Sequence, residues 1–336
     1  MVSGVANLKS GVREFFAQRF SQDPIPDFDF DLGDHPKITV DQNLFLESTP
    51  SRDEIKNAVW ACGTDKAPGF DGYNFKFIRE MWDLVQDDTY EFVMEFFNSG
   101  ASARNINITW VTLIPKRVDP QSIDDYRPIS MVGAIYKIIS KLLSFRLKMV
   151  ISPLIDESQS AFVMNRQILD GVLVANESLR WLKKKKIHGA LLKLDFQKAY
   201  DSVNWSFLRL VMEKLGFGSK WIRWIMNCVS SASMSIILNG SPLRPFKMEK
   251  GLRQGDPLSP YLFILVTEVL GILLNRAQDL HLIDPLKIGK DKVCLKLLQF
   301  ANDTLIFIPH DLVCITNYFR ILDVFALMFG LSLNYS

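Results

Sequence analysis

The chain has 336 residues, of which 48% are hydrophobic and 23% charged, so it is long enough for two or three packed units and too apolar for global disorder. Its apolar stretches are interrupted by Lys, Arg, Asp or Pro, and its first residues lack a compact apolar core, so we expect neither a transmembrane helix nor a signal peptide. The four cysteines are scattered, which excludes zinc-finger spacing and favours a reduced, intracellular compartment: Cys62, Cys228, Cys294 and Cys314.

The net charge of +2 hides an uneven distribution along the chain. Residues 21–60 hold nine acids against three basic residues, a balance of −6, whereas residues 114–150 hold seven basic residues against three acids, a balance of +4. A basic stretch suits a polyanionic partner, although many such stretches are only solvated faces.

The first predicted element is a helix, followed by an acidic, proline-containing arm at residues 23–36. The pair Ser51 and Glu54 has capping-box spacing, which predicts a helix that ends at Gly63. The Gly- and Pro-rich stretch 65–77 then predicts a loop. The first helix rests on apolar residues at helical spacing: Val12, Phe15, Phe16 and Phe20.

The middle of the chain alternates strands and helices. Residues 110–115 predict a strand, and residues 135–150 predict a helix with Pro153 beyond its end. A second buried strand is expected at residues 190–194, and it ends in Asp195.

Polar caps mark the next elements. Asn204 is the expected N-cap of a helix that ends at Gly216. The alternating stretch 234–238 leads into Asn239 and Gly240, a dipeptide typical of a two-residue hairpin.

The last third predicts a helix over about 261–274, a hairpin over 295–308 and a helix over 312–329 that stops at Gly330. The whole pattern indicates an α+β protein with two hairpins. The polar pair Asn302 and Asp303 is expected at the tip of the second hairpin.

Two acids stand at the ends of predicted strands, Asp195 and Asp303. If these strands pair in one sheet, both acids project from the same edge. Converging carboxylates suit Mg²⁺, and paired metal ions can clamp the attacking and leaving oxygens of a phosphoryl transfer. On spacing alone an ordinary turn-forming role for each acid stays open.

Six stretches change this interpretation because they occur together and in a fixed order. They include LDFQKAYDSVNW at 194–205 and QFANDTLIF at 299–307. Together they resemble the reverse transcriptase of LINE-type non-LTR retrotransposons, especially those of plants, from about residue 50 to the end of the chain. The remaining four stretches are residues 66–78, 113–143, 155–172 and 239–263.

The resemblance implies a polymerase right hand, with fingers and palm, an antiparallel palm sheet and no thumb. It implies that residues 1–49 are a connector after a missing endonuclease domain, that 50–190 are the fingers, and that 191–336 are a palm truncated before the thumb. It also implies an RNA template, a DNA primer and deoxynucleoside triphosphates as partners, Mg²⁺ or Mn²⁺ as the cofactor, and a nuclear location.

The resemblance also implies roles for single residues. Asp195 and Asp303 match the metal-binding acids, and Tyr200 matches the aromatic gate that crowds a 2′-hydroxyl. Lys116 and Arg127 match the residues that hold the triphosphate, a task that suits a point charge and a planar fork.

Four more residues are assigned in the same way. Gln254 and Gly255 match the block that positions the nucleotide and the template base. Arg253 is expected to contact a phosphate, and Arg166 is expected to contact the template or the nucleotide.

One position departs from the family. Where the family has Phe/Tyr-Ala-Asp-Asp, this chain has Phe300-Ala301-Asn302-Asp303. The amide of Asn302 is neutral, and its NH₂ half cannot ligate a cation. We therefore expect impaired polymerisation from a decayed copy or fragment. The alternatives are a non-catalytic nucleic-acid-binding remnant and a relic without function.

Overall fold

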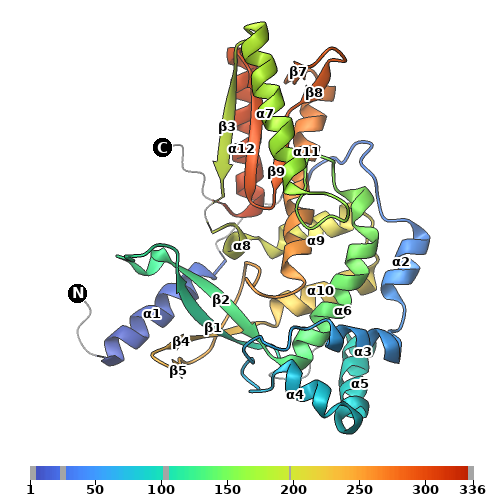
Figure 1. Ribbon diagram of the computed structural model, residues 1–336, viewed down its shortest axis with the longest axis vertical. Helices are drawn as coiled ribbons and strands as arrows, with labels where there is room; N and C mark the ends of the chain where they lie inside the picture. Colours follow the sequence, from blue (N-terminus) through green and yellow to red (C-terminus); the bar gives the residue numbers. More distant parts are fainter. Residues whose placement is uncertain (1–4, 23–27, 101–105, 197, 332–336) are drawn as a thin grey trace. The chain divides into compact units, whose positions relative to one another are not determined.

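The computed structural model describes residues 5–22, 28–100, 106–196 and 198–331, and it divides into two compact units (Figure 1). Unit 1 contains Met1–Asp23, Val40–Leu147 and Phe217–Ser259. Unit 2 contains Pro24–Thr39, Lys148–Gly216 and Pro260–Ser336. Each unit is therefore built from three separate stretches of chain, and the predicted boundaries after residues 49 and 190 stay predictions.

Unit 1 is organised around a five-stranded sheet in the order β2-β1-β4-β5, with β6 also paired to β4. Strands β1 and β2 form an antiparallel hairpin, whereas β1 and β4 are parallel. The strands are β1 (Ile108–Pro115), β2 (Tyr126–Val132), β4 (Ser233–Leu238), β5 (Ser241–Pro242) and β6 (Phe246–Lys247).

The turn between β4 and β5 confirms the predicted hairpin. Asn239 and Gly240 both have positive φ, 50° and 75°, as a two-residue hairpin turn requires. Ile237 and Leu238 on one side then pair with Pro242 and Ser241 on the other.

The helices of unit 1 include the predicted capping-box helix. The side chain of Ser51 accepts from the Glu54 N–H, and the Glu54 side chain accepts from the Ser51 N–H, so both reciprocal bonds are present. The helices are α1 (Val5–Arg19), α2 (Val40–Glu47), α3 (Arg52–Trp60), α4 (Phe75–Glu80), α5 (Trp82–Ser99), most of α6 (Ala134–Val150) and α10 (Ser219–Ser230).

Unit 2 contains a three-stranded antiparallel sheet in the order β3-β10-β9 and a separate β7–β8 hairpin. The sheet confirms that the two strands carrying the predicted metal-binding acids are direct neighbours. The strands are β3 (Gly189–Asp195), β7 (Leu286–Ile288), β8 (Val293–Leu295), β9 (Leu297–Phe300) and β10 (Asp303–Pro309).

Two of the predicted caps of unit 2 are confirmed. The side chain of Asn204 accepts from the Phe207 N–H at the start of α9, and Gly330 ends α12 with a φ of 89°. The helices are α7 (Ile168–Lys185), α8 (Ala199–Ser202), α9 (Trp205–Lys214), α11 (Ser259–Asp279), which begins at the last residue of unit 1, and α12 (Leu312–Phe329).

The described part of the predicted acidic arm, from residue 28 onward, belongs to unit 2. Asp29 lies 2.6 Å from Lys214, and Asp31 lies 3.1 Å from Arg276. These contacts attach the arm to α9 and α11, while residues 23–27 of the same stretch lie outside the described residues.

Among the described residues, α11 and α12 are long and apolar enough to cross a membrane by length and composition. Of the most apolar window in each helix, 72% is buried for α11 and 39% for α12. Core helices of soluble proteins pass the same test, so these two helices are weak evidence for a membrane span.

Candidate active site

The acid-bearing ends of β3 and β10 lie side by side in unit 2. Asp303 is the direct register partner of Asp195, and the pairing continues to Pro309 opposite Gly189. Directly opposite positions of an antiparallel pair share one face of the sheet. The structure thus brings the two predicted metal-binding positions together, although only the backbone of Asp195 is described.

The turn that precedes Asp303 consists of two residues. Phe300 pairs with Asp303, so Ala301 and Asn302 alone connect β9 to β10. Asp303 is consequently the first residue of β10, which corrects the expectation that Asn302 and Asp303 both lie at the tip. Ala301 has a φ of 54°, a left-handed conformation that is uncommon for a residue with a side chain.

Asp303 is exposed and lies close to the Lys193 ammonium. The Lys193 ammonium lies 3.7 Å from the Asp303 carboxylate, and both side chains are more than half exposed, at 67% and 59%. Such an ion pair contributes little and leaves the carboxylate accessible.

The donor set at this edge fits a divalent cation. Carboxylate oxygens at two opposed positions and the amide oxygen of the adjacent Asn302 are the hard ligands that Mg²⁺ prefers. Two opposed carboxylates also repel each other unless a cation lies between them. Among the described side chains, which exclude that of Asp195, no group of three or more His, Cys, Asp or Glu forms a metal cluster.

Tyr200, the predicted aromatic gate, packs inside unit 2. Its ring stacks on Phe263 with centroids 4.4 Å apart and planes 4° from parallel. Burial raises the pKa of Tyr200 to about 12, so the phenol stays neutral at physiological pH. The stacking fixes the ring plane.

Lys116 and Arg127 lie on the β1–β2 hairpin of unit 1. Arg127 is opposite Ile114, and the Lys116 N–H donates to the carbonyl of Asp125 at 2.7 Å. Both side chains are exposed. The structure therefore brings these two predicted triphosphate-binding cations to the same end of one hairpin.

Gln254 and Gly255 lie in a loop that is tied to β2. The Ser130 N–H donates to the Gln254 carbonyl at 2.7 Å. Gly255 has a φ of 108°, and a Cβ at this position would lie 2.7 Å from the Ser130 carbonyl oxygen. Glycine is required here by the backbone of β2 itself.

Gly255→Ala is expected to lower the free energy of unfolding by about 2–4 kcal/mol, because backbone strain and a steric clash act together. Gly240→Ala is the matched control, since Gly240 also has positive φ but has open space around its Cβ position. Urea unfolding of both variants measures the difference. If both variants lose the same free energy of unfolding, the backbone can move the Ser130 carbonyl away from a Cβ at residue 255 without cost.

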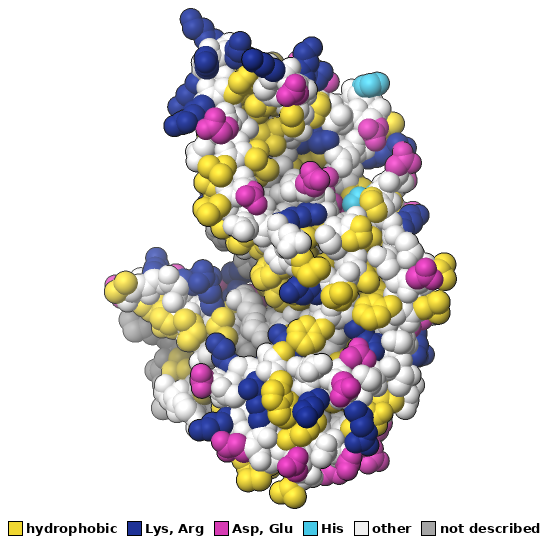
Figure 2. Space-filling model, turned by 45° about the vertical axis from the view of Figure 1, so that its right-hand side comes forward, with side chains coloured by type: hydrophobic (Ala, Val, Ile, Leu, Met, Phe, Trp, Pro, Cys, Tyr) yellow, Lys and Arg dark blue, Asp and Glu magenta, His cyan; other side chains and the backbone are white. Residues whose placement is uncertain are grey.

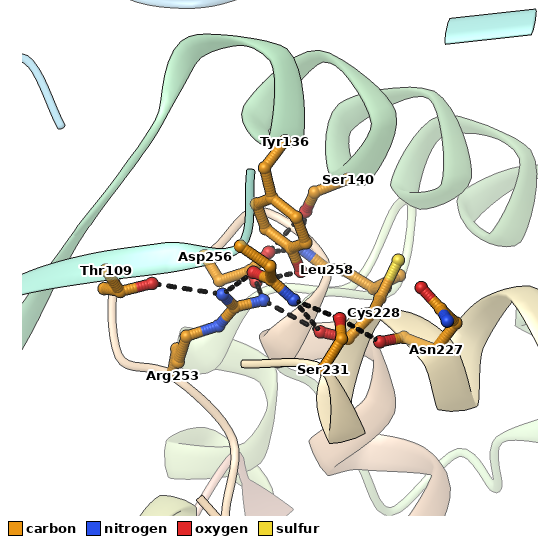
Figure 3. A network of polar contacts seen from close by, with 10 residues as sticks. Thr109, Tyr136, Ser140, Asn227, Cys228, Ser231, Arg253, Asp256 and Leu258 are labelled. Carbon is orange, nitrogen blue, oxygen red and sulfur yellow. Dashed lines mark hydrogen bonds and ion pairs between the residues drawn. The ribbon is translucent and has the colours of Figure 1, made fainter. Parts of the chain in front are cut away.

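Arg253 is buried in unit 1 and is held by an ion pair (Figure 3). The guanidinium is 3% exposed and lies 2.8 Å from the Asp256 carboxylate, beneath the ring of Tyr136 at 4.1 Å from its centroid. It also donates to the Thr109 hydroxyl and the Cys228 carbonyl, each at 3.1 Å. A phosphate cannot reach this guanidinium in the described conformation, so the predicted phosphate contact gains no support.

Asp256 connects the same loop to α6. Its carboxylate accepts from the Tyr136 hydroxyl at 2.6 Å, from the Ser140 hydroxyl and from the Leu258 N–H at 3.0 Å (Figure 3). Burial raises the pKa of Tyr136, which keeps its hydroxyl protonated as a donor. Sequence reasoning missed Tyr136 and Ser140, because nothing local links α6 to residue 256.

Arg166 is also occupied within its own unit. Its guanidinium donates to the carbonyls of Ile155 and Gln159, both at 2.8 Å, to that of Ser152 at 3.4 Å and to that of Asp156. The predicted template or nucleotide contact therefore competes with four intramolecular bonds.

Exposed lysines gather at the end of unit 2 where α7 and the β7–β8 hairpin lie, at the top of the view in Figure 2. Leu182 and Leu286 belong to one buried cluster, which brings the lysines that follow each of them close together. This basic patch is at the Gly189 end of β3, away from Asp195. Its members are Lys183, Lys184, Lys185, Lys186, Lys287, Lys290 and Lys292.

Comparison with known protein families matches residues 114–336 to the family described as reverse transcriptase (RNA-dependent DNA polymerase). This match covers most of unit 2 and, in unit 1, residues 114–147 and 217–259, and it includes the strands that carry Asp195 and Asp303.

Three similar proteins extend this finding. A transposon TX1 uncharacterized 149 kDa protein of Xenopus laevis is 30% identical over 98% of this chain and 25% of its own length. A Pol polyprotein from the type-1 retrotransposable element R2 of Popillia japonica is 28% identical over 66% of this chain and 30% of its own length. An uncharacterized mitochondrial protein of Arabidopsis thaliana is 47% identical over 20% of this chain and 56% of its own length. The chain thus spans about a quarter to a third of the first two relatives.

Proposed function

Because the chain belongs to the reverse transcriptase (RNA-dependent DNA polymerase) family, and to its LINE-type, non-LTR branch, we propose that it catalyses RNA-directed DNA synthesis. The substrates are a DNA primer on an RNA template and deoxynucleoside triphosphates. The observation that carries the proposal is the direct pairing of Asp195 with Asp303 at one end of the sheet of unit 2.

The acid pair would hold Mg²⁺, or Mn²⁺ in its place. Bound there, the cation would neutralise charge that develops on the attacking and leaving oxygens of the phosphoryl transfer. Asp195 and Asp303 supply the anionic ligands, and Asn302 supplies at most a neutral amide oxygen. The rigid antiparallel pairing keeps the two acid positions at a fixed separation.

The remaining assigned residues bind and select the nucleotide in this proposal. Lys116 and Arg127 neutralise the triphosphate, which suits their exposure at the end of one hairpin. Tyr200 presents a ring whose plane is fixed by Phe263, as a steric gate against a 2′-hydroxyl requires. Gln254 and Gly255 position the nucleotide and the template base.

We further propose that this copy is of plant origin and has decayed. The Arabidopsis thaliana relative has the highest identity of the three, over a short stretch, and supports the first point. Asn302 supports the second, because it replaces a charged ligand by a neutral one of nearly the same shape.

The test is extension of a DNA primer on an RNA template with and without Mg²⁺, comparing the natural chain, Asp303→Asn and Asn302→Asp. We expect slow, Mg²⁺-dependent extension by the natural chain, faster extension by Asn302→Asp and none by Asp303→Asn. Extension that survives in Asp303→Asn, or its absence from both the natural chain and Asn302→Asp, would overturn the proposal.

A second candidate function is nucleic-acid binding without catalysis. Asn302 favours this second function, because the loss of a metal ligand leaves the basic surfaces unchanged. These surfaces include the exposed lysines at the end of α7. In that case a primer–template duplex binds with a salt-dependent affinity, while no variant at residue 302 extends the primer.

A further inference from the structure

A short segment before α7 extends the sheet that carries the acid pair. The Gln299 N–H of β9 donates to the Ser158 carbonyl at 2.7 Å, and the Ser160 N–H donates to the Gln299 carbonyl at 3.0 Å. Gln159 and Gln299 form a parallel bridge between these bonds. The segment Ser158–Ser160 therefore lies beside β9, next to the turn that leads to Asp303.

The Gln159 side chain reaches the turn itself. It is 1% exposed, and its Oε1 accepts from the Ala161 N–H at 2.9 Å and from the Ala301 N–H at 3.1 Å. Two backbone donors on one oxygen fix the orientation of the amide. Its Nε2 is buried and finds no hydrogen-bond partner within the described part of the chain.

The bond to Ala301 acts on the least favourable backbone position of the turn. Ala301 has a φ of 54° and is buried at 8% exposure. A left-handed conformation is unfavourable for a residue other than glycine, and it persists only where its surroundings enforce it. The Gln159 Oε1 can accept from the Ala301 N–H only while the turn keeps this conformation.

The segment that carries Gln159 is itself firmly anchored. Arg166 donates to four carbonyls between Ser152 and Gln159. On the other side, the Asp156 N–H donates to Glu268 of α11 at 3.1 Å. Glu268 is 3% exposed, and burial raises its pKa well above the usual range for a carboxyl.

We propose that Gln159 is a positioning residue for the acid pair. It holds Ala301 in the left-handed conformation and so places Asp303 opposite Asp195, while Arg166 acts through the segment that it anchors. The link to the acid pair rests on the proposed metal-dependent function. The hold on Ala301 does not, so the two can be tested separately.

The first measurement is hydrogen exchange at the Ala301 amide in the full chain. Gln159→Met removes the acceptor at similar volume and is expected to speed exchange about tenfold or more, as loss of roughly 1.4 kcal/mol of local stability would. Gln159→Glu keeps acceptor oxygens and should restore the protection. Gln299→Met is the matched control, because Gln299 is a buried neighbour whose side chain contacts Thr304 instead.

If Gln159→Met fails to fold, Gln159→Asn serves in its place. Asparagine keeps an amide, but its side chain is one methylene shorter, which draws the acceptor oxygen away from the Ala301 N–H. Unchanged exchange at Ala301 in a folded Gln159 variant would overturn the hold on the turn. Equal acceleration in Gln299→Met would do the same, because it would show general loosening of the sheet.

The second measurement is Mn²⁺ binding followed by electron paramagnetic resonance. Gln159→Met is expected to weaken binding about tenfold relative to the natural chain, and Gln299→Met should leave it unchanged. Faster Ala301 exchange with unaltered Mn²⁺ affinity would overturn the link to the acid pair. If the natural chain binds no Mn²⁺, the proposed metal site fails, while the exchange measurement still decides the role of Gln159 at the turn.

Discussion

Replacing Asn302 by aspartate is expected to raise the rate of Mg²⁺-dependent primer extension by about 10²–10⁴, because a metal-centred contribution of several kcal/mol is partly restored. Asn302 is the second residue of the two-residue turn and directly precedes Asp303. The Asp195 position lies opposite Asp303 on the neighbouring strand β3. The new carboxylate adds an anionic ligand beside the acid pair without a change in side-chain volume.

Single-turnover extension at several Mg²⁺ concentrations measures this effect. The matched control is Asn239→Asp, which makes the same substitution in the other two-residue hairpin turn, between β4 and β5 of unit 1. We expect no rate increase from the control. A failure of Asn302→Asp to extend faster than the natural chain would show that the amide is not what limits the reaction.

Arg253→Met is expected to lower the free energy of unfolding by about 3–5 kcal/mol, because it leaves the buried carboxylate of Asp256 without its counter-charge. Both side chains are almost fully buried, at 3% and 4% exposure. Replacing both by apolar residues, as in Arg253→Met with Asp256→Leu, should recover part of the loss, limited by the donors of Tyr136 and Ser140 that would remain unpaired.

Denaturant unfolding measures the loss, and primer–template binding measured against salt concentration separates the two roles of Arg253. A phosphate contact predicts a salt slope smaller by about one in Arg253→Met with the fold intact. A positioning role predicts reduced stability with an unchanged slope in the folded protein. Arg117→Met is the control, because Arg117 is 55% exposed in its ion pair with Asp125, and it should change stability little.

Local signals in the sequence predicted much of the fold because they act over a few residues. The capping box at Ser51, the N-cap at Asn204 and the turn at Asn239 and Gly240 all depend on short-range hydrogen bonds or φ values. Each of them is confirmed for that reason. The acid-bearing strands were likewise predictable, since apolar runs that end in Asp195 and flank Asp303 define them.

The extent of helix α7 was not predicted, and its composition explains why. The helix exposes several large apolar side chains in its first half and contains Gly171, a residue that is unfavourable in a helix interior. The exposed apolar residues of α7 are Ile168, Leu169, Val172, Leu173 and Val174.

The parallel pairing of β1 with β4 could not be predicted from the sequence either, because it joins residues more than a hundred positions apart.

The roles of the arginines depended on long-range packing. From the sequence, Arg166 and Arg253 are cations next to motif residues, and an exposed contact with a polyanion is a reasonable expectation. The structure surrounds each guanidinium with carbonyls, hydroxyls or a carboxylate from the same unit. Gln159 lacked any local signal, because its partner at Ala301 is 142 positions away.

The division of each unit among three stretches of chain has a consequence for how the protein is made. β4 and the Arg253 loop belong to unit 1 but follow much of unit 2 in the sequence. Neither unit can complete its core until the ribosome has passed residue 259. Until then both units are incompletely folded intermediates with part of their apolar surface exposed. A stop codon between residues 24 and 259 would leave both units incomplete, and an early frameshift would abolish them together.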